Sequence, residues 1–261
     1  LLVRQQAKRT HLSTAAPMTP FVESESSSNV TSSSFPELDA NLYGGIPKGS
    51  NILITGKIGA GKSSFGRHFI EEGLKQGEKC LWITLDDDPK KIRKKLNATL
   101  PLDATDYESQ NQLRFVDAYS WSSMTQSDSE PFAINGALDL NQLSGIISDA
   151  SYELDQTIQK KSGGRRIVDS ISSLLINFEL ANVQRFLNQI ARTAVSFGGI
   201  TTLFIIEEGT VEEQTLNNIK YIMDGIIEFK EENEVRQMRV SSMKWTSFNK
   251  NWIDYPKTVI S

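Results

Sequence analysis

The sequence predicts an α/β fold in which a mainly parallel sheet is flanked by helices and ends in late antiparallel strands. Short apolar segments alternate with segments of helical spacing, which is typical of parallel strands joined by crossover helices. Glycine-rich and acidic motifs follow these strands, at the sheet edge where ligands bind in such folds. A late pair of strand-like segments, 240–243 and 252–260, completes the pattern.

Strands are predicted where short runs of branched and other apolar residues are bounded by glycine or polar residues. These runs lie at 51–55, 80–85, 113–119, 166–169, 201–206 and 225–229. Apolar residues at helical spacing predict helices at 65–74, 89–96, 140–154 and 183–195. Gly77 suits the C-terminal cap of the first helix, because glycine readily adopts the left-handed conformation found there.

The composition is that of an ordinary globular protein. Of its 261 residues, 38% are hydrophobic and 23% are charged, which suffices for one α/β domain with a core. No run of about 18 apolar residues occurs, so we expect no membrane span and a cytoplasmic location. The formal net charge of −4 and the pI of about 5.4 lack the basic footprint of nucleic-acid binding, although a local basic groove would escape this test.

Cys80 is the single cysteine, so the chain forms no internal disulfide. With His11 and His68 as its two histidines, zinc coordination is disfavoured. Because Cys80 begins the apolar run 80–83, we interpret it as a buried packing residue.

Residues 1–35 are predicted to be a disordered polar tail, and residues 36–261 the folded domain. The tail contains a serine-rich run at 24–34 and has little helical or strand periodicity. Its first twenty residues include no acid, which resembles an organellar transit peptide. The tail is therefore either a targeting segment or, as we favour, a flexible extension.

Residues 56–63, GKIGAGKS, match the phosphate-loop pattern G-x-x-x-x-G-K-S/T between a predicted strand and a predicted helix. The glycines allow backbone N–H groups to surround phosphate oxygens, and the helix N-terminus adds a positive dipole. The Lys62 cation suits the β- and γ-phosphates of ATP. The predicted nucleotide-binding residues are Gly56, Lys57, Ile58, Gly59, Ala60, Gly61, Lys62, Ser63 and Ser64. The alternative is a simple glycine turn between strand and helix.

A magnesium ion bound with ATP needs a carboxylate beside the hydroxyl of Ser63. Asp169 ends the short strand 166–169 and is the candidate. We therefore predict Ser63 and Asp169 as the Mg²⁺ ligands, with a strand-end aspartate that caps the next turn as the alternative.

Several further motifs occur in a consistent order: GGIPKG at 44–49, DDDP at 86–89, FVDAYSW at 115–121, VDSIS at 168–172 and YIMDGII at 221–227. Together they resemble the KaiC branch of the RecA-type ATPases, and most closely the archaeal KaiC-like proteins, from about residue 35 to residue 260, which is most of the chain. The resemblance implies a RecA-like P-loop NTPase core that assembles into a ring, often a hexamer, with ATP between neighbouring subunits.

The resemblance also implies catalytic roles. The family's paired glutamates, which prepare the attacking water, correspond to Asp86 and Asp87, whose side chains are one methylene shorter. The alternative is a solvated acidic turn that caps the helix beginning at Pro89. Glu207, at the end of the strand 201–206, is either a sensor of the γ-phosphate or an exposed loop acid.

The family often reaches the neighbour's γ-phosphate with a lysine and an arginine in a K-x-R-G-T segment. Here the matching segment is SMKWT at 242–246, in which Ser242 replaces the first cation and Lys244 replaces the arginine. Lysine supplies charge but not the forked contact of arginine, so activation across the interface is weakened.

Three functions follow. The first is an ATPase that hydrolyses slowly and acts as a regulatory or signalling switch in a homo-oligomeric ring with an unidentified protein partner. The second is a signalling module that binds ATP without turnover. The third, a RecA-type recombinase acting on DNA, is disfavoured by the acidic charge balance and by the lack of a recognisable extra DNA-binding domain.

Overall fold

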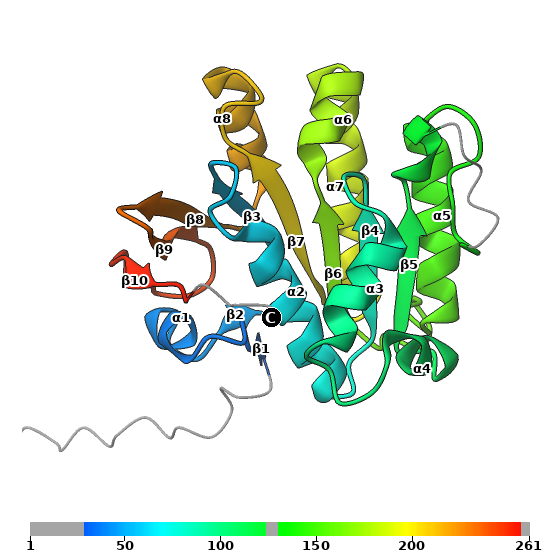
Figure 1. Ribbon diagram of the computed structural model, residues 1–261, viewed down its shortest axis with the longest axis horizontal. Helices are drawn as coiled ribbons and strands as arrows, with labels where there is room; N and C mark the ends of the chain where they lie inside the picture. Colours follow the sequence, from blue (N-terminus) through cyan, green and yellow to red (C-terminus); the bar gives the residue numbers. More distant parts are fainter. Residues whose placement is uncertain (1–28, 124–129, 257–261) are drawn as a thin grey trace, which may run out of the picture.

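The computed structural model describes residues 29–123 and 130–256, and within them an eight-stranded sheet lies between two layers of helices (Figure 1). The strand order is β10-β9-β8-β3-β7-β6-β4-β5. The strands from β8 to β5 in this order run parallel to one another, whereas β9 and β10 add an antiparallel edge. The predicted fold class is confirmed.

The strands of this sheet match the predicted segments closely. They are β3 (Asn51–Gly56), β4 (Cys80–Thr84), β5 (Leu113–Asp117), β6 (Gly164–Asp169), β7 (Ile200–Glu207), β8 (Gly225–Glu232), β9 (Val235–Met243) and β10 (Ile253–Asp254). The predicted strand at 252–260 is present only as the short β10, and residues 257–261 lie outside the described part. The strand predicted at 240–243 begins earlier, at Val235, because charged and polar side chains conceal the alternation in its first half.

One layer of helices covers one face of the sheet, and a second layer covers the opposite face (Figure 1). The first layer contains α2 (Lys62–Lys75), α3 (Pro89–Asn97) and α4 (Ala104–Ser109). The second contains α5 (Leu140–Glu153), α6 (Ile171–Asn177), α7 (Leu180–Ser196) and α8 (Glu213–Ile222). The remaining helical elements are α1 (Pro36–Asn41) and a 3₁₀ turn (Ser120–Ser123). The four predicted helices are confirmed, whereas α1, α4, α6 and α8 are too short or too polar to give a periodic signal.

Apolar residues at helical spacing bury one face of each long helix. In α2, Phe65, Phe69 and Leu74 pack on the sheet, and in α7, Phe186 and Ile190 do so on the other side. Cys80 is fully buried, as predicted, and burial raises the pKa of its thiol.

The fold includes residues that the sequence assigned to the tail. The strand β1 (Val30–Thr31) pairs with β2 (Ile46–Pro47), and Ser33 is fully buried. The Asp39 carboxylate accepts hydrogen bonds from Ser33 N and from Ser32 Oγ, both 2.8 Å long. Ordered structure therefore begins before the predicted boundary at residue 36, whereas residues 1–28 of the predicted tail lie outside the described part.

Within the described residues, no helix combines the length and the apolar character needed to cross a membrane.

Candidate functional site

The phosphate loop leaves the carboxyl end of β3, and α2 begins at its last residues (Figure 1). Gly59 and Gly61 have φ angles of 84° and 104°, in the left-handed region that favours glycine. A Cβ atom on Gly61 would lie 2.7 Å from Cε1 of Tyr255, whereas one on Gly59 would meet no atom within 4 Å. The space beside Gly59 is therefore open, as close approach of a ligand to the loop backbone requires.

Lys62 is buried at the start of α2, and its ammonium group is fully engaged. Its Nζ atom donates to the carbonyl oxygens of Gly56 and Lys57, each at 2.8 Å, and to Glu207 Oε2 at 2.7 Å. Only 2% of the Lys62 side chain is exposed, but 24% of the Glu207 side chain is. Glu207 is therefore the acceptor that a competing anion could displace.

Ser63 and Asp169 lie together although they are far apart in the sequence. The Ser63 hydroxyl donates to Asp169 Oδ1 at 3.4 Å. Two oxygens in adjacent positions around octahedral Mg²⁺, each about 2.1 Å from the ion, are separated by about 3 Å. The pair therefore fits Mg²⁺, whose remaining ligands are usually water and phosphate oxygens. Among the described residues, no group of three or more His, Cys, Asp or Glu side chains is arranged to hold a metal ion.

The pKa of Asp169 is raised to about 7. Burial is the largest cause, followed by the negative charge of Asp86, and the charges of Glu207 and Asp87 add to it; the hydrogen bond from Ser63 acts in the opposite direction. Such a carboxyl group is partly protonated near neutral pH. A cation bound there replaces a proton and relieves the repulsion among these acids.

The three successive aspartates after β4 have different partners. Asp88 is the N-cap of α3, because its Oδ1 accepts a 2.8 Å hydrogen bond from Lys90 N. Asp86 instead accepts hydrogen bonds from Ser170 Oγ, at 2.5 Å, and from Ser173 Oγ. The alternative that Asp86 caps this helix is therefore wrong.

Asp87 also leaves the helix cap to Asp88, and its carboxylate turns toward lysines of α3. Lys95 Nζ lies 2.8 Å from Asp87 Oδ2, and Lys91 Nζ lies 3.6 Å from Oδ1. The spacing from Asp87 to Lys91 is that of an i, i+4 pair, a signal in the sequence that could have identified this contact.

Two cavities flank the phosphate loop. One of about 360 Å³ lies between α2 and α3, and its lining includes Ser63, Ser64, Asp86, Asp87, Asp169 and Glu207. The other, of about 610 Å³, lies between the loop and the β8–β9 hairpin, and its lining includes Lys57, Ile58, Gly59, Ala60, Phe229 and Arg236. The structure thus brings the predicted nucleotide, magnesium and acidic residues around one loop.

Lys244 does not join this group within one chain. It follows Met243, which pairs with Gly225 at the start of β8, whereas Gly56 at the phosphate loop pairs with Phe229. Lys244 therefore lies toward the opposite edge of the sheet. Its side chain is 50% exposed, and its Nζ lies 3.3 Å from Asp224 Oδ1.

The comparison with known families agrees with this geometry. A family model described as ATPase: KaiC matches residues 31–256. The chain belongs to the KaiC ATPase family. This membership supports ATP binding and implies the use of Mg²⁺ with the nucleotide.

Relatives of this KaiC-family chain include several UPF0273 proteins. One from Methanopyrus kandleri is 30% identical over 179 residues, covering 64% of this chain and 70% of the relative. One from Pyrococcus horikoshii is 26% identical over 212 residues, covering 80% and 81%. A solved structure of a KaiC-like protein from Pyrococcus horikoshii has a TM-score of 0.63 at 21% identity, covering 86% of this chain and 98% of that one. The structural similarity supports the RecA-like fold.

Proposed function

We propose that this chain binds ATP with Mg²⁺, hydrolyses it slowly and acts as a regulatory switch in a ring-shaped homo-oligomer. The observation that carries the proposal is the convergence of Ser63, Asp169, Asp86 and Glu207, the carboxylate partner of Lys62, around one cavity beside a complete phosphate loop. Family membership supports nucleotide binding, and the acidic residues support hydrolysis.

Each residue has a distinct task in this proposal. Loop N–H groups and Lys62 bind the phosphates, and Lys62 must exchange its contact with Glu207 for a phosphate oxygen. Ser63 and Asp169 would hold Mg²⁺, which when bound neutralises phosphate charge and orients the γ-phosphoryl group. These groups are positioned before the reaction, which is the main contribution a protein makes to phosphoryl transfer.

Asp86 is the better placed of the two candidate bases. Its carboxylate accepts a hydrogen bond from Ser170, the residue that follows Asp169, and its negative charge raises the pKa of Asp169 more than that of Asp87 does. Two serine hydroxyls hold its carboxylate, whereas Asp87 is ion-paired to α3. We therefore assign the orientation of the attacking water to Asp86 and a supporting role to Asp87.

Two features make turnover slow. Serine hydroxyls already occupy both oxygens of Asp86, so a water must displace one of them, and Asp87 is ion-paired with Lys95. In addition, Lys244 is remote from the phosphate loop of its own chain, so its charge would reach a nucleotide only in a neighbouring subunit. Loss of a stabilising cation costs orders of magnitude in phosphoryl transfer, and we expect turnover below about 1 s⁻¹.

The test replaces Asp86 and Asp87 together with Asn in the full chain. We expect phosphate release to be abolished while ATP affinity, measured by calorimetry, stays within about threefold, because neither side chain contacts the phosphate loop. The single variants serve as controls, and Asp86→Asn should cost more than Asp87→Asn. Hydrolysis by the double variant at the parental rate would move the base elsewhere, with Glu207 the next candidate.

The second candidate function is an ATP-binding module without turnover. It is favoured by the observation that both candidate bases are already engaged, Asp86 by serines and Asp87 by lysines. The parent protein decides between the two functions: an assembled oligomer that binds ATP and releases no phosphate supports the module. Light scattering with and without Mg²⁺ and ATP tests the ring, which a monomer under all conditions would exclude.

A further inference from the structure

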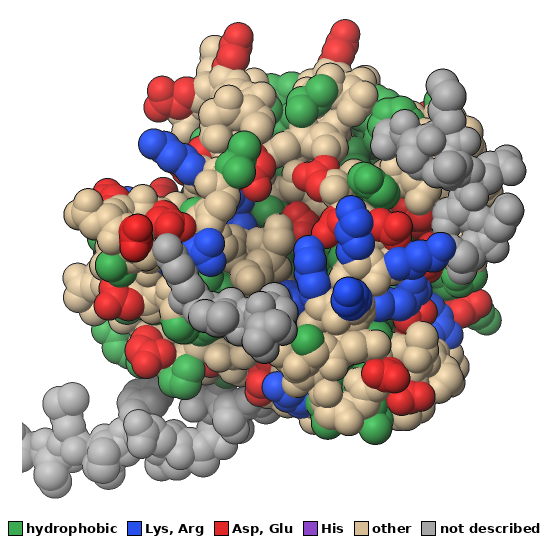
Figure 2. Space-filling view, viewed as in Figure 1, with side chains coloured by type: hydrophobic (Ala, Val, Ile, Leu, Met, Phe, Trp, Pro, Cys, Tyr) green, Lys and Arg blue, Asp and Glu red, His purple; other side chains and the backbone are tan. Residues whose placement is uncertain are grey.

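The helix α3 carries a concentrated positive face beside the cavity of about 360 Å³ that holds Asp86 and Asp169, which the proposed function makes the catalytic cavity. We define the α3 lysine face as Lys90, Lys91, Lys94 and Lys95, all of which are exposed. At 3.6 residues per turn these positions fall within an arc of about 140°, opposite the buried Ile92 and Leu96. Figure 2 shows basic side chains gathered over this helix, in a protein whose net charge is −4.

The four lysines divide into two pairs. Lys91 and Lys95 approach the Asp87 carboxylate, at 3.6 Å and 2.8 Å. Lys90 and Lys94 form no ion pair with any other residue that the structure describes. One side of the face therefore neutralises a catalytic-site acid, and the other side presents two uncompensated charges to solvent.

The surroundings of the face favour a short acidic polypeptide over a nucleic acid. The helix has nine residues and is about 13 Å long, which matches about four residues of an extended peptide. Acidic residues flank α3 along the chain. Asp88 precedes the helix, and Asp103 and Asp106 follow it at the start of α4. A long polyphosphate chain would run into these acids, whereas a short segment would not.

The residue types on α3 point the same way. Its arginine, Arg93, turns from the solvent to Glu108 and Glu130, at 2.6 Å and 2.5 Å. The helix contains no aromatic side chain on which a base could stack. Lysines without arginine or aromatic neighbours provide charge attraction to carboxylates but no base recognition.

We propose that the α3 lysine face docks an acidic segment of a protein partner, and that docking draws Lys91 and Lys95 away from Asp87. The negative charge of Asp87 is then no longer compensated by these lysines beside the cavity that holds Ser63 and Asp169, and turnover rises. The proposed docking depends only on the α3 lysine face. The proposed stimulation of turnover rests on the proposed hydrolysis, and it would let a partner regulate the switch.

The experiment uses a short poly-L-glutamate peptide as the probe and an oligo(dT) strand as the competing polyanion, at low and high salt. Binding to the parent is compared with a Lys90→Ala/Lys94→Ala variant and with a control of equal charge loss, Lys75→Ala/Lys161→Ala, on other exposed lysines. We expect the peptide affinity to fall about five- to tenfold in the α3 variant, with little change in the control. Basal turnover should not change, because neither Lys90 nor Lys94 contacts the site.

Stimulation is measured separately. The peptide should raise phosphate release at least about threefold, and Lys91→Ala/Lys95→Ala should reproduce that rise without peptide and remove the response to it. Tighter binding of oligo(dT) than of peptide, or equal binding by the α3 and control variants, would overturn the docking surface. Peptide binding without a change in the turnover of an active parent would overturn the release of Asp87. A parent without turnover would instead refute the hydrolysis proposal, and the binding comparison would still decide the docking surface.

Discussion

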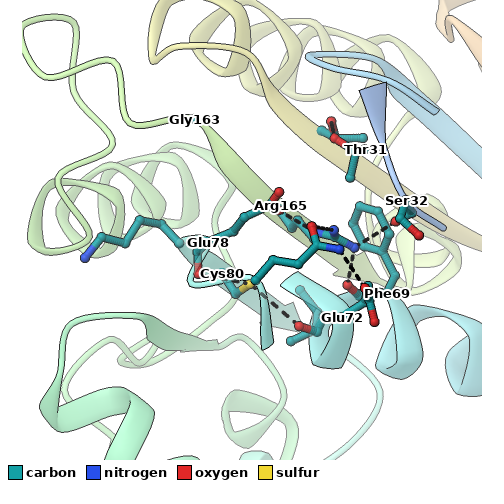
Figure 3. A network of polar contacts seen from close by, with 12 residues as sticks. Thr31, Ser32, Phe69, Glu72, Glu78, Cys80, Gly163 and Arg165 are labelled. Atoms are coloured by element: carbon teal, nitrogen blue, oxygen red, sulfur yellow. Dashed lines mark hydrogen bonds and ion pairs between the residues drawn. The ribbon is translucent and has the colours of Figure 1, made fainter. Parts of the chain in front are cut away.

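Two buried cations at opposite ends of the sheet show how differently one fold uses the same kind of group. Arg165, near the start of β6, is fully buried beside α2 (Figure 3). Its Nε donates to Glu78 Oε2 at 2.6 Å, and its Nη1 donates to the carbonyl oxygens of Ser32 and Phe69 at 2.9 Å and 2.8 Å. These contacts connect three parts of the fold: the segment before α1, the helix α2 and the sheet.

Lys62 has three acceptors, and one of them faces a cavity. Glu207 lines the space that holds Ser63 and Asp169, so a phosphate could replace it. Glu78, the carboxylate partner of Arg165, is 23% exposed but lines neither cavity beside the phosphate loop, and the Arg165 guanidinium also stacks over the Phe69 ring at 4.6 Å. The comparison teaches that burial and pairing alone do not mark a functional cation; a displaceable partner at a cavity does.

The comparison is tested most strongly by Arg165→Leu. This change leaves Glu78, Gln76 and two carbonyl groups without their donor and removes the guanidinium from the Phe69 ring, a combined loss of about 3 kcal/mol. We expect the free energy of unfolding, from denaturant titration, to fall by about 3 kcal/mol. The ATP affinity of the folded protein should stay within about threefold, because Arg165 lies at the other end of the sheet.

The adjacent Arg166 provides a matched control. It is equally buried, on the opposite face of β6, and forms no ion pair within the described residues; burial lowers its pKa to about 10. Arg166→Leu should therefore cost less than about 1.5 kcal/mol, since an uncompensated charge is removed from the core. Equal losses in the two variants would show that volume, and not the network of Arg165, determines the stability.

Lys62→Ala should give the converse result. It removes the cation that faces the most highly charged phosphates, so ATP affinity should fall at least about tenfold, or about 1.4 kcal/mol. The free energy of unfolding should change by less than that, because the abandoned Glu207 is partly exposed and can be hydrated. Unchanged affinity in calorimetry would contradict the phosphate-loop assignment.

The sequence predicts the phosphate loop itself but not the contacts that other strands bring to it. The phosphate loop could be predicted because glycines, lysine and serine at fixed spacing encode a local backbone conformation. The contact of Lys62 with Glu207 could not, because it depends on β3 and β7 being neighbours, an order that periodicity does not reveal. The same limit applies to Ser173, which reaches Asp86 only because β4 pairs with β6.

Other failures have local causes. The start of β9 was hidden because its first three residues, which are exposed or half-buried, include charged and polar side chains. Glycine is unfavourable inside a helix, but at Gly73 in α2 a Cβ atom would lie 2.5 Å from Cδ of Arg165. That glycine makes room for the buried guanidinium, and only the packed structure reveals the reason.

The smallest effect, and the sharpest for the comparison, is expected from Glu207→Gln. If a phosphate can replace Glu207 at the Lys62 ammonium group, the Glu207 carboxylate opposes ATP binding in two ways. It occupies the ammonium group, and its negative charge repels phosphate. Glutamine keeps the shape but removes the charge, so ATP affinity should rise about threefold, or about 0.7 kcal/mol. Glu208→Gln is the matched control, because Glu208 accepts a 3.0 Å hydrogen bond from Thr55 and has no contact with Lys62. Calorimetry at constant Mg²⁺ measures both. Weaker ATP binding in Glu207→Gln would mean that this acid assists the nucleotide, as a γ-phosphate sensor would, and that its pairing with Lys62 is not a competing state.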